Sequence, residues 1–336
     1  MPKFNNVLLR LAREQLSCSQ SKIAEKIGVR QAVFSKYENG VIVPPEKIQE
    51  KIAEILHYPL SFFQQEMDEI PSGLIHHRKR TTLTATLRLK IEAEVRLRLI
   101  DVMRMAVDQK IQSNILSRDS RTPQEMAIAI RRHWRISTGP ISNLVEIMEN
   151  NGIVIIYYDF YTDLIDGFYL RLPTGQICVA LNANKAFSPD RNRFTLAHEL
   201  GHALLHKNTL PDKATEREAD DFASELLLPA AEIRQPLTPP LTFTRLLELK
   251  KIWKVSIGAL IYRANRLGTI TAFTYRKLWT YMSSCGYRKK EPNCGIIRET
   301  PCLLDEMLKQ QQKKTPDLCS FFHLKPDILK ARYPQV

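Results

Sequence analysis

The sequence has no long apolar run: nothing in its 336 residues approaches the 18 consecutive apolar residues that a membrane-spanning helix needs. The best run, at 153–158, has only the length of one buried strand. The N-terminus also lacks the apolar core of a secretory signal, because Arg10 and Arg13 come early in the chain. We therefore expect a soluble, cytoplasmic protein without a membrane partner.

Cysteine is scarce and is not spaced as a disulfide framework. Six cysteines are spread along the chain, and four of them lie between 285 and 319 without forming a C-x-x-C pair. In a cytoplasmic protein such thiols stay reduced. A structural zinc site within 285–319 is one interpretation, but the wide spacing favours ordinary thiols in a helical tail.

Charge of one sign dominates only in parts of the chain. The net charge of +13 is distributed as +3 over 1–80, +5 over 81–135, −6 over 136–235 and +11 over 236–336. An acidic block is thus flanked by basic regions, and in a cytoplasmic protein a basic region suggests nucleic acid as the partner. A lysine-rich surface that only keeps the protein soluble is the alternative.

The chain is longer than one compact core usually allows, so we expect several domains. Periodicity and turn residues predict an α+β protein that is mostly helical. The expected regions are a five-helix domain at 1–70, a connecting region at 71–120, a mixed α+β core at 121–235 and a basic helical region at 236–336.

Local patterns place the individual elements. Apolar residues at helical spacing predict a long helix from 83 to 107 that connects domains or dimerises, preceded by a Pro-Ser-Gly linker at 71–73. After Gly152 the pattern changes from helical to strand-like. The expected helices of the core are 123–134 and 140–150, and the expected strands are 153–158, 167–172 and 177–181, the last two joined by a turn at 173–176.

The strongest chemical signal is the segment His-Glu-Leu-Gly-His at 198–202. On a helix, residues four apart lie on the same side, so the imidazoles of His198 and His202 point to one spot. Two neutral imidazoles suit zinc, and Glu199 between them can act as general base toward a water at the metal. Ser188 followed by Pro189 is a typical helix start just upstream, with the serine as N-cap.

A catalytic zinc usually needs a third ligand from the protein. Glu216 and Asp220 share one face of a second amphipathic helix, which suits a ligand carboxylate and a carboxylate that holds the other nitrogen of a ligand histidine. Glu218 is the competing ligand, but Thr215 and Glu218 have the spacing of a capping box, so Glu216 is favoured. His206 continues the histidine stripe; a support for a ligand or a core residue is favoured over a direct ligand, and stabilisation of an oxyanion is a further interpretation.

Two segments, 193–206 and 216–229, resemble the signature of ImmA/IrrE-type metallopeptidases, and the resemblance extends over 120–290. It implies a minimal zincin-type domain with a small sheet and the His-Glu-x-x-His helix. The zinc ligands that it implies are His198, His202 and Glu216, with Glu199 as the base. Enzymes of this family relieve repression by cleaving helix-turn-helix repressors, in prophage switches or DNA-damage responses. A degenerate member that senses a signal without cleaving is the alternative.

Residues 19–40 have the pattern of a helix-turn-helix. Ser19 is placed to cap a first helix, and Gly28 allows the tight turn to a second. Because Phe34 and Tyr37 are expected to face inward, the opposite side of the second helix is left for base and phosphate contacts, with a glutamine suited to adenine. The side chains expected to contact DNA are Gln20, Arg30, Gln31, Ser35 and Lys36.

Residues 4–67 resemble the XRE/Cro family of phage-repressor-like regulators, the class to which the substrates of the related peptidases belong. Phe34 is bulkier than the usual aliphatic residue and the domain is only weakly basic, so a helical bundle for protein contacts is the alternative. A second pattern of this kind lies at 246–270, around 253–256. It suits either nucleic-acid binding or packing against the peptidase core.

Together these patterns predict a DNA-binding transcriptional regulator with a zinc-dependent endopeptidase domain. Its expected partners are an operator in double-stranded DNA, a helix-turn-helix repressor as substrate, single-stranded DNA as activator and a second copy of the chain in a homodimer. Cleavage would act in trans, in a stress, prophage or defence response, or in cis between residues 40 and 120, near the basic segment 75–80. A non-proteolytic sensor is the alternative, and a scaffold that uses both domains for contacts is the weaker one.

Overall fold

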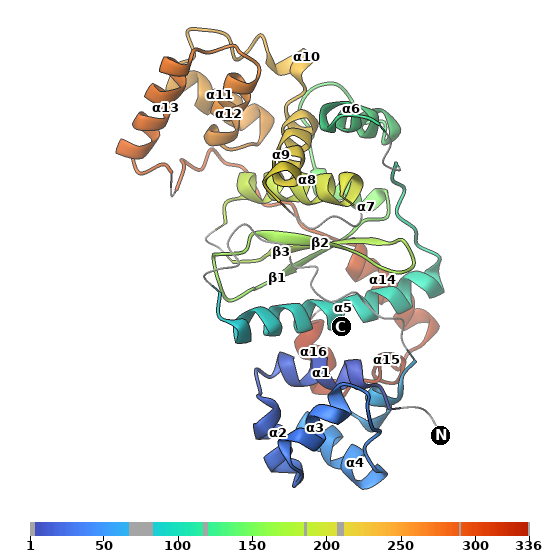
Figure 1. Ribbon diagram of the computed structural model, residues 1–336. Coiled ribbons are helices and arrows are strands. Elements are labelled where there is room, and N and C mark those ends of the chain that lie inside the picture. Colours follow the sequence, from blue (N-terminus) through green and yellow to red (C-terminus); the bar gives the residue numbers. More distant parts are fainter. Residues whose placement is uncertain are drawn as a thin grey trace. The chain divides into compact units, whose positions relative to one another are not determined.

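The computed structural model describes residues 4–66, 83–116, 120–184, 187–206, 212–288 and 290–334. These residues form two compact units (Figure 1). The first unit combines the described parts of 1–112 and 302–336 with the short segment 171–176, and the second unit combines those of 113–170 and 177–301. The expected linker at 71–73 and the basic segment 75–80 lie outside the described residues.

The first unit begins with five short helical segments, which confirms the expected N-terminal helical domain. Their bounds are α1 Asn6–Gln15, α2 Gln20–Ile27, α3 Gln31–Glu38, α4 Glu46–Ile55 and the 3-10 helix η1 Leu60–Gln64. The Ser19 hydroxyl accepts a hydrogen bond from Lys22 N at 3.2 Å and caps α2, and Gly28, with φ 79°, ends it. Phe34 and Tyr37 are buried, as the pattern predicted.

The rest of the first unit is also helical. It consists of α5 Ala85–Gln109, α14 Leu303–Lys314, α15 Leu318–Phe322 and α16 Pro326–Arg332. Helix α5 packs against both α1 and α14, so the first and last parts of the chain meet on one helix. Asp101 of α5 accepts hydrogen bonds from Arg332 Nη1 at 2.6 Å and from Tyr333 Oη at 2.9 Å. Since Arg332 Nη2 also donates to Tyr58 Oη at 3.2 Å, the network ties all three parts together.

The second unit is built on a three-stranded sheet with the order β1-β3-β2. The strands are β1 Val154–Tyr158, β2 Gly167–Arg171 and β3 Ile177–Asn182. Strand β1 runs parallel to β3, with Val154 opposite Cys178 and Tyr158 opposite Asn182. Every residue of β3 is buried, as is typical of a central strand. The three expected strands are therefore confirmed to within one residue at each end.

Helices make up the remainder of the second unit. Their bounds are α6 Pro123–His133, α7 Leu144–Asn150, α8 Pro189–Leu205, α9 Lys213–Leu227, α10 Ala230–Ile233, α11 Phe243–Trp253, α12 Ile257–Arg266 and α13 Ala272–Ser284. Helix α8 packs against β3 on one side and along α9 on the other, so it lies at the centre of the unit (Figure 1). In the part of the chain that the structure describes, no helix is long and apolar enough to cross a membrane.

Helices α11 and α12 belong to the same core. Leu246, Trp253 and Leu260 are buried in the apolar cluster that also holds side chains of α8 and α9. The second helix-turn-helix pattern, at 246–270, therefore uses its apolar side for packing. Its apolar spacing is explained by this burial without any nucleic acid.

The expected boundary at 235 does not match the division of the structure. Residues 236–301 pack with the second unit, whereas 302–336 return to the first. One C-terminal region was expected because 236–336 is basic, but most of its basic side chains lie on the surface. Which core a helix joins is decided by its buried apolar residues, and these act over long separations in sequence.

Candidate functional site

Helix α8 carries the His-Glu-x-x-His segment, and its local sequence explains its start and its orientation. Pro189 occupies the first turn, where its missing N–H is harmless. Ser188 stands at the N-cap position as expected, but its side chain makes no capping hydrogen bond. Leu200 is buried in the core cluster, which leaves His198 and His202 near α9.

Gly201 determines how closely α8 and α9 approach. A Cβ atom at this position would lie 3.0 Å from Phe222 Cδ1 and 3.3 Å from Ala219 Cα. Any larger residue would have to push α9 away. The close crossing places Glu216, in the first turn of α9, next to the two histidines of α8.

Among the described residues, one group of potential ligands has atoms close enough to share a metal ion: His198, His202 and Glu216, all within 4.8 Å of one another. The two histidine Nε2 atoms are 3.0 Å apart, and Glu216 Oε1 lies 3.3 Å from His202 Nε2. Glu216 Oε2 lies 3.7 Å from His198 Nε2. Two imidazoles and one carboxylate are a typical protein donor set of a catalytic zinc, which leaves a fourth position open. The residues present therefore fit zinc.

Each candidate histidine ligand is held through its other ring nitrogen. His198 Nδ1 lies 2.9 Å from Asp220 Oδ1. Burial alone would lower the pKa of His198, but the hydrogen bond to Asp220 and the nearby carboxylates outweigh it and raise the pKa. Burial lowers the pKa of His202, which favours the neutral ring that a metal ligand requires.

His202 is supported by a second histidine instead of a carboxylate. Its Nδ1 lies 3.0 Å from Nδ1 of His206, and His206 Nε2 lies 2.9 Å from Glu218 Oε2. Both ring nitrogens of His206 are therefore engaged in hydrogen bonds. This geometry favours the supporting role for His206 over the oxyanion role, because neither nitrogen is left to donate to a substrate.

The predicted capping box of Thr215 and Glu218 is wrong. Helix α9 begins at Lys213, and the Asp212 carboxylate accepts from Thr215 N at 2.8 Å while Thr215 Oγ1 accepts from Asp212 N at 2.8 Å. The box is thus one turn earlier, and Glu218 is free of that task and contacts His206. The sequence placed His206 one helical step beyond His202 but gave no sign of its contact with Glu218.

Glu199 lies beside the metal-binding group and is 8% exposed. Its Oε2 accepts a hydrogen bond from Tyr169 N, in strand β2, at 3.0 Å. Burial raises the pKa of Glu199 to about 7; the charge of His198 opposes this rise and that of Glu216 adds to it. The Tyr169 ring also stacks near His202, with centroids 6.3 Å apart, and its hydroxyl donates to His206 O at 3.1 Å. Sequence reasoning missed Tyr169, because a strand residue carries no local sign of a distant helix.

The cysteines take no part in the metal-binding group. All six are free thiols. The four between 285 and 319 are divided between the two units, and no metal-binding group of the described residues includes them.

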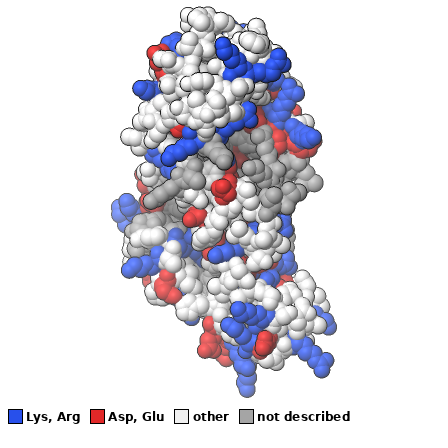
Figure 2. All heavy atoms as spheres, turned by 90° about the vertical axis from the view of Figure 1, so that its left-hand side faces the viewer, with Lys and Arg blue, Asp and Glu red and all other residues white. Residues whose placement is uncertain are grey.

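The residues expected to contact DNA lie at the start of α2, just before α3 and along α3. Arg30, Gln31 and Lys36 are exposed, and Ser35 is half-buried. Gln31 Nε2 donates to Gln20 Oε1 at 2.8 Å, so these two side chains hold each other. In Figure 2, the lower end of the visible face, where the helices of the first unit lie, carries Lys and Arg side chains interspersed with acidic ones.

The Gln20–Gln31 pair is anchored to the interior of the domain. Gln20 Nε2 donates to Glu38 Oε2 at 2.7 Å, and Glu38 is 1% exposed. Arg13 Nε donates to Glu38 Oε1 at 2.6 Å and neutralises the buried carboxylate. A chain of four side chains thus runs from the core to the tip of α3. It fixes the orientation of Gln31 before any ligand is bound.

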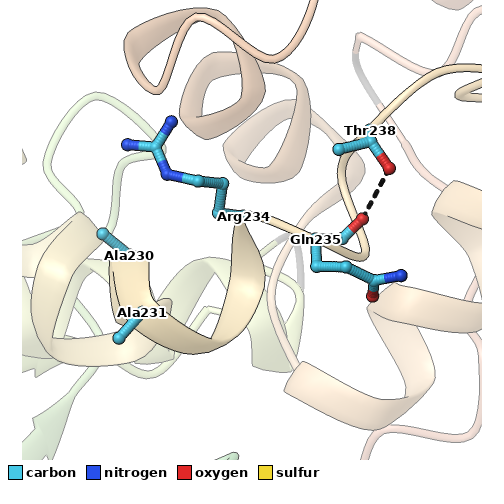
Figure 3. A pocket seen from close by; sticks show the side chains of 5 residues that line it. All are labelled: Ala230, Ala231, Arg234, Gln235 and Thr238. Atoms are coloured by element: carbon cyan, nitrogen blue, oxygen red, sulfur yellow. Dashed lines mark hydrogen bonds between the residues drawn. The ribbon is translucent and has the colours of Figure 1, made fainter.

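A separate cavity lies on and after α10. Its lining consists of Ala230, Ala231, Arg234, Gln235 and Thr238, as Figure 3 shows. Arg234 Nη1 donates to Leu267 O at 2.9 Å, and Thr238 Oγ1 donates to Gln235 O at 2.7 Å. None of the lining side chains is a metal ligand or a general base, so this cavity is not the candidate catalytic site.

Comparison with known families matches two parts of the chain. Residues 148–265 match the IrrE N-terminal-like domain, a peptidase family, and this range contains β1 to β3, α8 and α9. Residues 9–63 match the helix-turn-helix family, which covers most of α1 to η1. No curated protein matches the chain significantly. The protein therefore joins a helix-turn-helix domain of the XRE type to a metallopeptidase domain of the ImmA/IrrE family.

Proposed function

We propose that the second unit is a zinc-dependent endopeptidase. The observation that supports this most directly is the convergence of His198, His202 and Glu216, with Glu199 beside them. These three residues would hold the zinc, and the open fourth position would receive water or substrate. When bound, zinc supplies a Lewis acid that polarises a carbonyl group and eases deprotonation of water.

Glu199 is the proposed general base. A pKa of about 7 is close to the operating pH of a cytoplasmic enzyme, so the carboxylate can both take and return a proton. Its Oε2 is held by the amide of Tyr169, which leaves Oε1 to take the proton from water and to deliver it to the leaving amine. The support of His198 by Asp220 keeps that ligand oriented during the reaction.

The proposed activity is tested with the zinc-replenished full chain and candidate helix-turn-helix repressors. We expect one zinc per chain by elemental analysis and zinc-dependent cleavage of a repressor. Glu199→Gln should keep the zinc and lose the cleavage. A wild-type protein that binds zinc but cleaves nothing, while Glu199→Gln still regulates transcription, would favour the sensor.

We propose that the first unit binds an operator in double-stranded DNA through α2 and α3. Gln31 would read a base edge in the major groove, with Arg30, Ser35 and Lys36 on bases or phosphates and Gln20 on a phosphate. The exposure of Arg30, Gln31 and Lys36 supports this arrangement. So does the internal chain that holds Gln31, because a fixed side chain loses less entropy on binding.

The proposed substrate is a separate repressor, cleaved in trans in a cytoplasmic stress, prophage or defence response. A cut of the chain between residues 66 and 83 would leave the contacts of the N-terminal helices with α5 and α16 in place, among them Tyr58 with Arg332 and Gln15 with Glu94. A cut there would therefore not by itself release the DNA-binding helices. Activation by single-stranded DNA and homodimer formation remain part of the proposal, and intact mass analysis with and without single-stranded DNA tests self-cleavage directly.

A further inference from the structure

A third histidine, at the C-cap position of α8, lies behind the candidate zinc ligands. His206 is 3% exposed, and its backbone N–H donates to His202 O at 2.9 Å. Its carbonyl oxygen accepts from the Tyr169 hydroxyl at 3.1 Å. The backbone of His206 is thus held from both sides, and the ring lies between Nδ1 of His202 and the carboxylate of Glu218.

The positions of the protons in this chain follow from its geometry. If His202 uses Nε2 as a metal ligand, the neutral ring carries its proton on Nδ1. That proton points to His206 Nδ1, 3.0 Å away, which must then accept. The proton of His206 is therefore on Nε2, where the Glu218 carboxylate accepts it at 2.9 Å. A carboxylate cannot donate when ionised, so Glu218 selects the tautomer of both rings.

The two candidate ligands are supported differently. Nδ1 of His198 contacts the Asp220 carboxylate directly, whereas Nδ1 of His202 reaches a carboxylate only through a second imidazole. A direct carboxylate partner is the common arrangement for a metal-bound histidine. Nothing in the packing of α9 requires Glu218 for capping, since Asp212 and Thr215 perform that task.

We propose that His206 and Glu218 are positioning residues: they form a relay that holds the proton of His202 on Nδ1 and so presents Nε2 to the metal. The inference rests on the proposed zinc site. It assigns Glu218 a role at that site without making it a ligand, and it gives the third histidine a defined tautomer.

The test uses the full chain with ¹⁵N-labelled histidine, and it measures zinc affinity by chelator competition and the tautomers by NMR. In the wild type we expect the proton on Nδ1 of His202 and on Nε2 of His206. His206→Leu removes the acceptor and should weaken zinc binding by about 10- to 100-fold. His206→Asn, whose amide oxygen can take the place of Nδ1, should restore much of the affinity.

Glu218→Ala provides a variant at a side chain that is 40% exposed, outside the apolar core. It should leave His206 in a mixture of tautomers and weaken zinc binding in the same direction as His206→Leu. The matched control is Asp221→Asn on the same helix, which breaks an ion pair with Arg266 and should leave zinc affinity unchanged.

The outcomes separate this inference from the proposed function. A wild-type chain that binds no zinc would overturn both. A wild type that binds zinc tightly, together with His206→Leu and Glu218→Ala variants of unchanged affinity and an unchanged His202 tautomer, would overturn the relay alone. His206→Leu could also lose zinc affinity that His206→Asn does not restore, while Glu218→Ala keeps the affinity of the wild type. That result would show that His206 acts only through packing, and it would overturn the relay.

Discussion

Replacing Arg332 by methionine tests whether the C-terminal helices are an integral part of the DNA-binding unit. The guanidinium and its partner, the Asp101 carboxylate, have 3% and 2% of their side-chain surface exposed and lie 2.6 Å apart. In Arg332→Met the carboxylate stays buried, and among the described residues the Tyr333 hydroxyl is the hydrogen-bond donor that remains to it. Removing one member of a buried ion pair destabilises a protein by about 3–5 kcal/mol, because the remaining charge is unpaired.

The matched control is Lys314→Met, which breaks the pair between Lys314 and Asp108. That pair has 50% and 42% of its side-chain surface exposed, so its loss should change the free energy of unfolding by about 0–1 kcal/mol. The double variant Asp101→Asn with Arg332→Met should regain part of the lost stability, because no buried carboxylate remains.

The assay has to separate the two units. All three tryptophans, at 134, 253 and 279, lie in the second unit, so tryptophan fluorescence in urea follows that unit. Hydrogen exchange of peptides from α1, α5 and α16 follows the first unit. In Arg332→Met we expect exchange in these helices to accelerate by roughly 100-fold or more, with an unchanged fluorescence midpoint. Equal exchange rates in Arg332→Met and Lys314→Met would refute this reasoning. A change in the fluorescence midpoint without any change in exchange would refute it as well.

Three further predictions concern the two candidate sites. His198→Ala should abolish or strongly weaken zinc binding, and Glu216→Ala should weaken it more than Glu218→Ala; equilibrium dialysis with zinc measures both, and the reverse order would make Glu218 the ligand. Gln31→Ala should relax base preference at one operator position by about 1–3 kcal/mol. Lys36→Ala should instead lower the affinity for all duplexes and reduce the slope of log affinity against log salt concentration by about 1. Binding titrations at several salt concentrations measure both effects. Gly201→Ala should destabilise the second unit by about 1–3 kcal/mol and weaken zinc binding, because its Cβ would force α9 away; unaltered zinc affinity would contradict this reading of the helix crossing.

The elements whose signals are local could be predicted from the sequence alone. The His-Glu-x-x-His spacing places two imidazoles on one side of a helix wherever that helix lies, because the period of the helix is fixed. The caps at Ser19 and Gly28 depend on neighbouring residues in the same way. The strands at 153–158, 167–172 and 177–181 also followed from local composition.

Tertiary structure alone decided which distant groups meet. The spacing of Thr215 and Glu218 predicted a local capping box. In the structure Thr215 forms its capping hydrogen bonds with Asp212, and Glu218 contacts His206 instead. Tyr169 reaches Glu199 because β2 lies beside α8, and no local pattern reports that pairing.

The predicted region boundary at 235 and the compact units of the structure differ for the same physical reason. Periodicity shows that a helix has an apolar face, but it does not show which core covers that face. Residues 236–301 bury theirs in the second unit, while 302–336 bury theirs against α5 in the first. Local geometry therefore determined the chemistry of single elements, and long-range packing determined which of them act together.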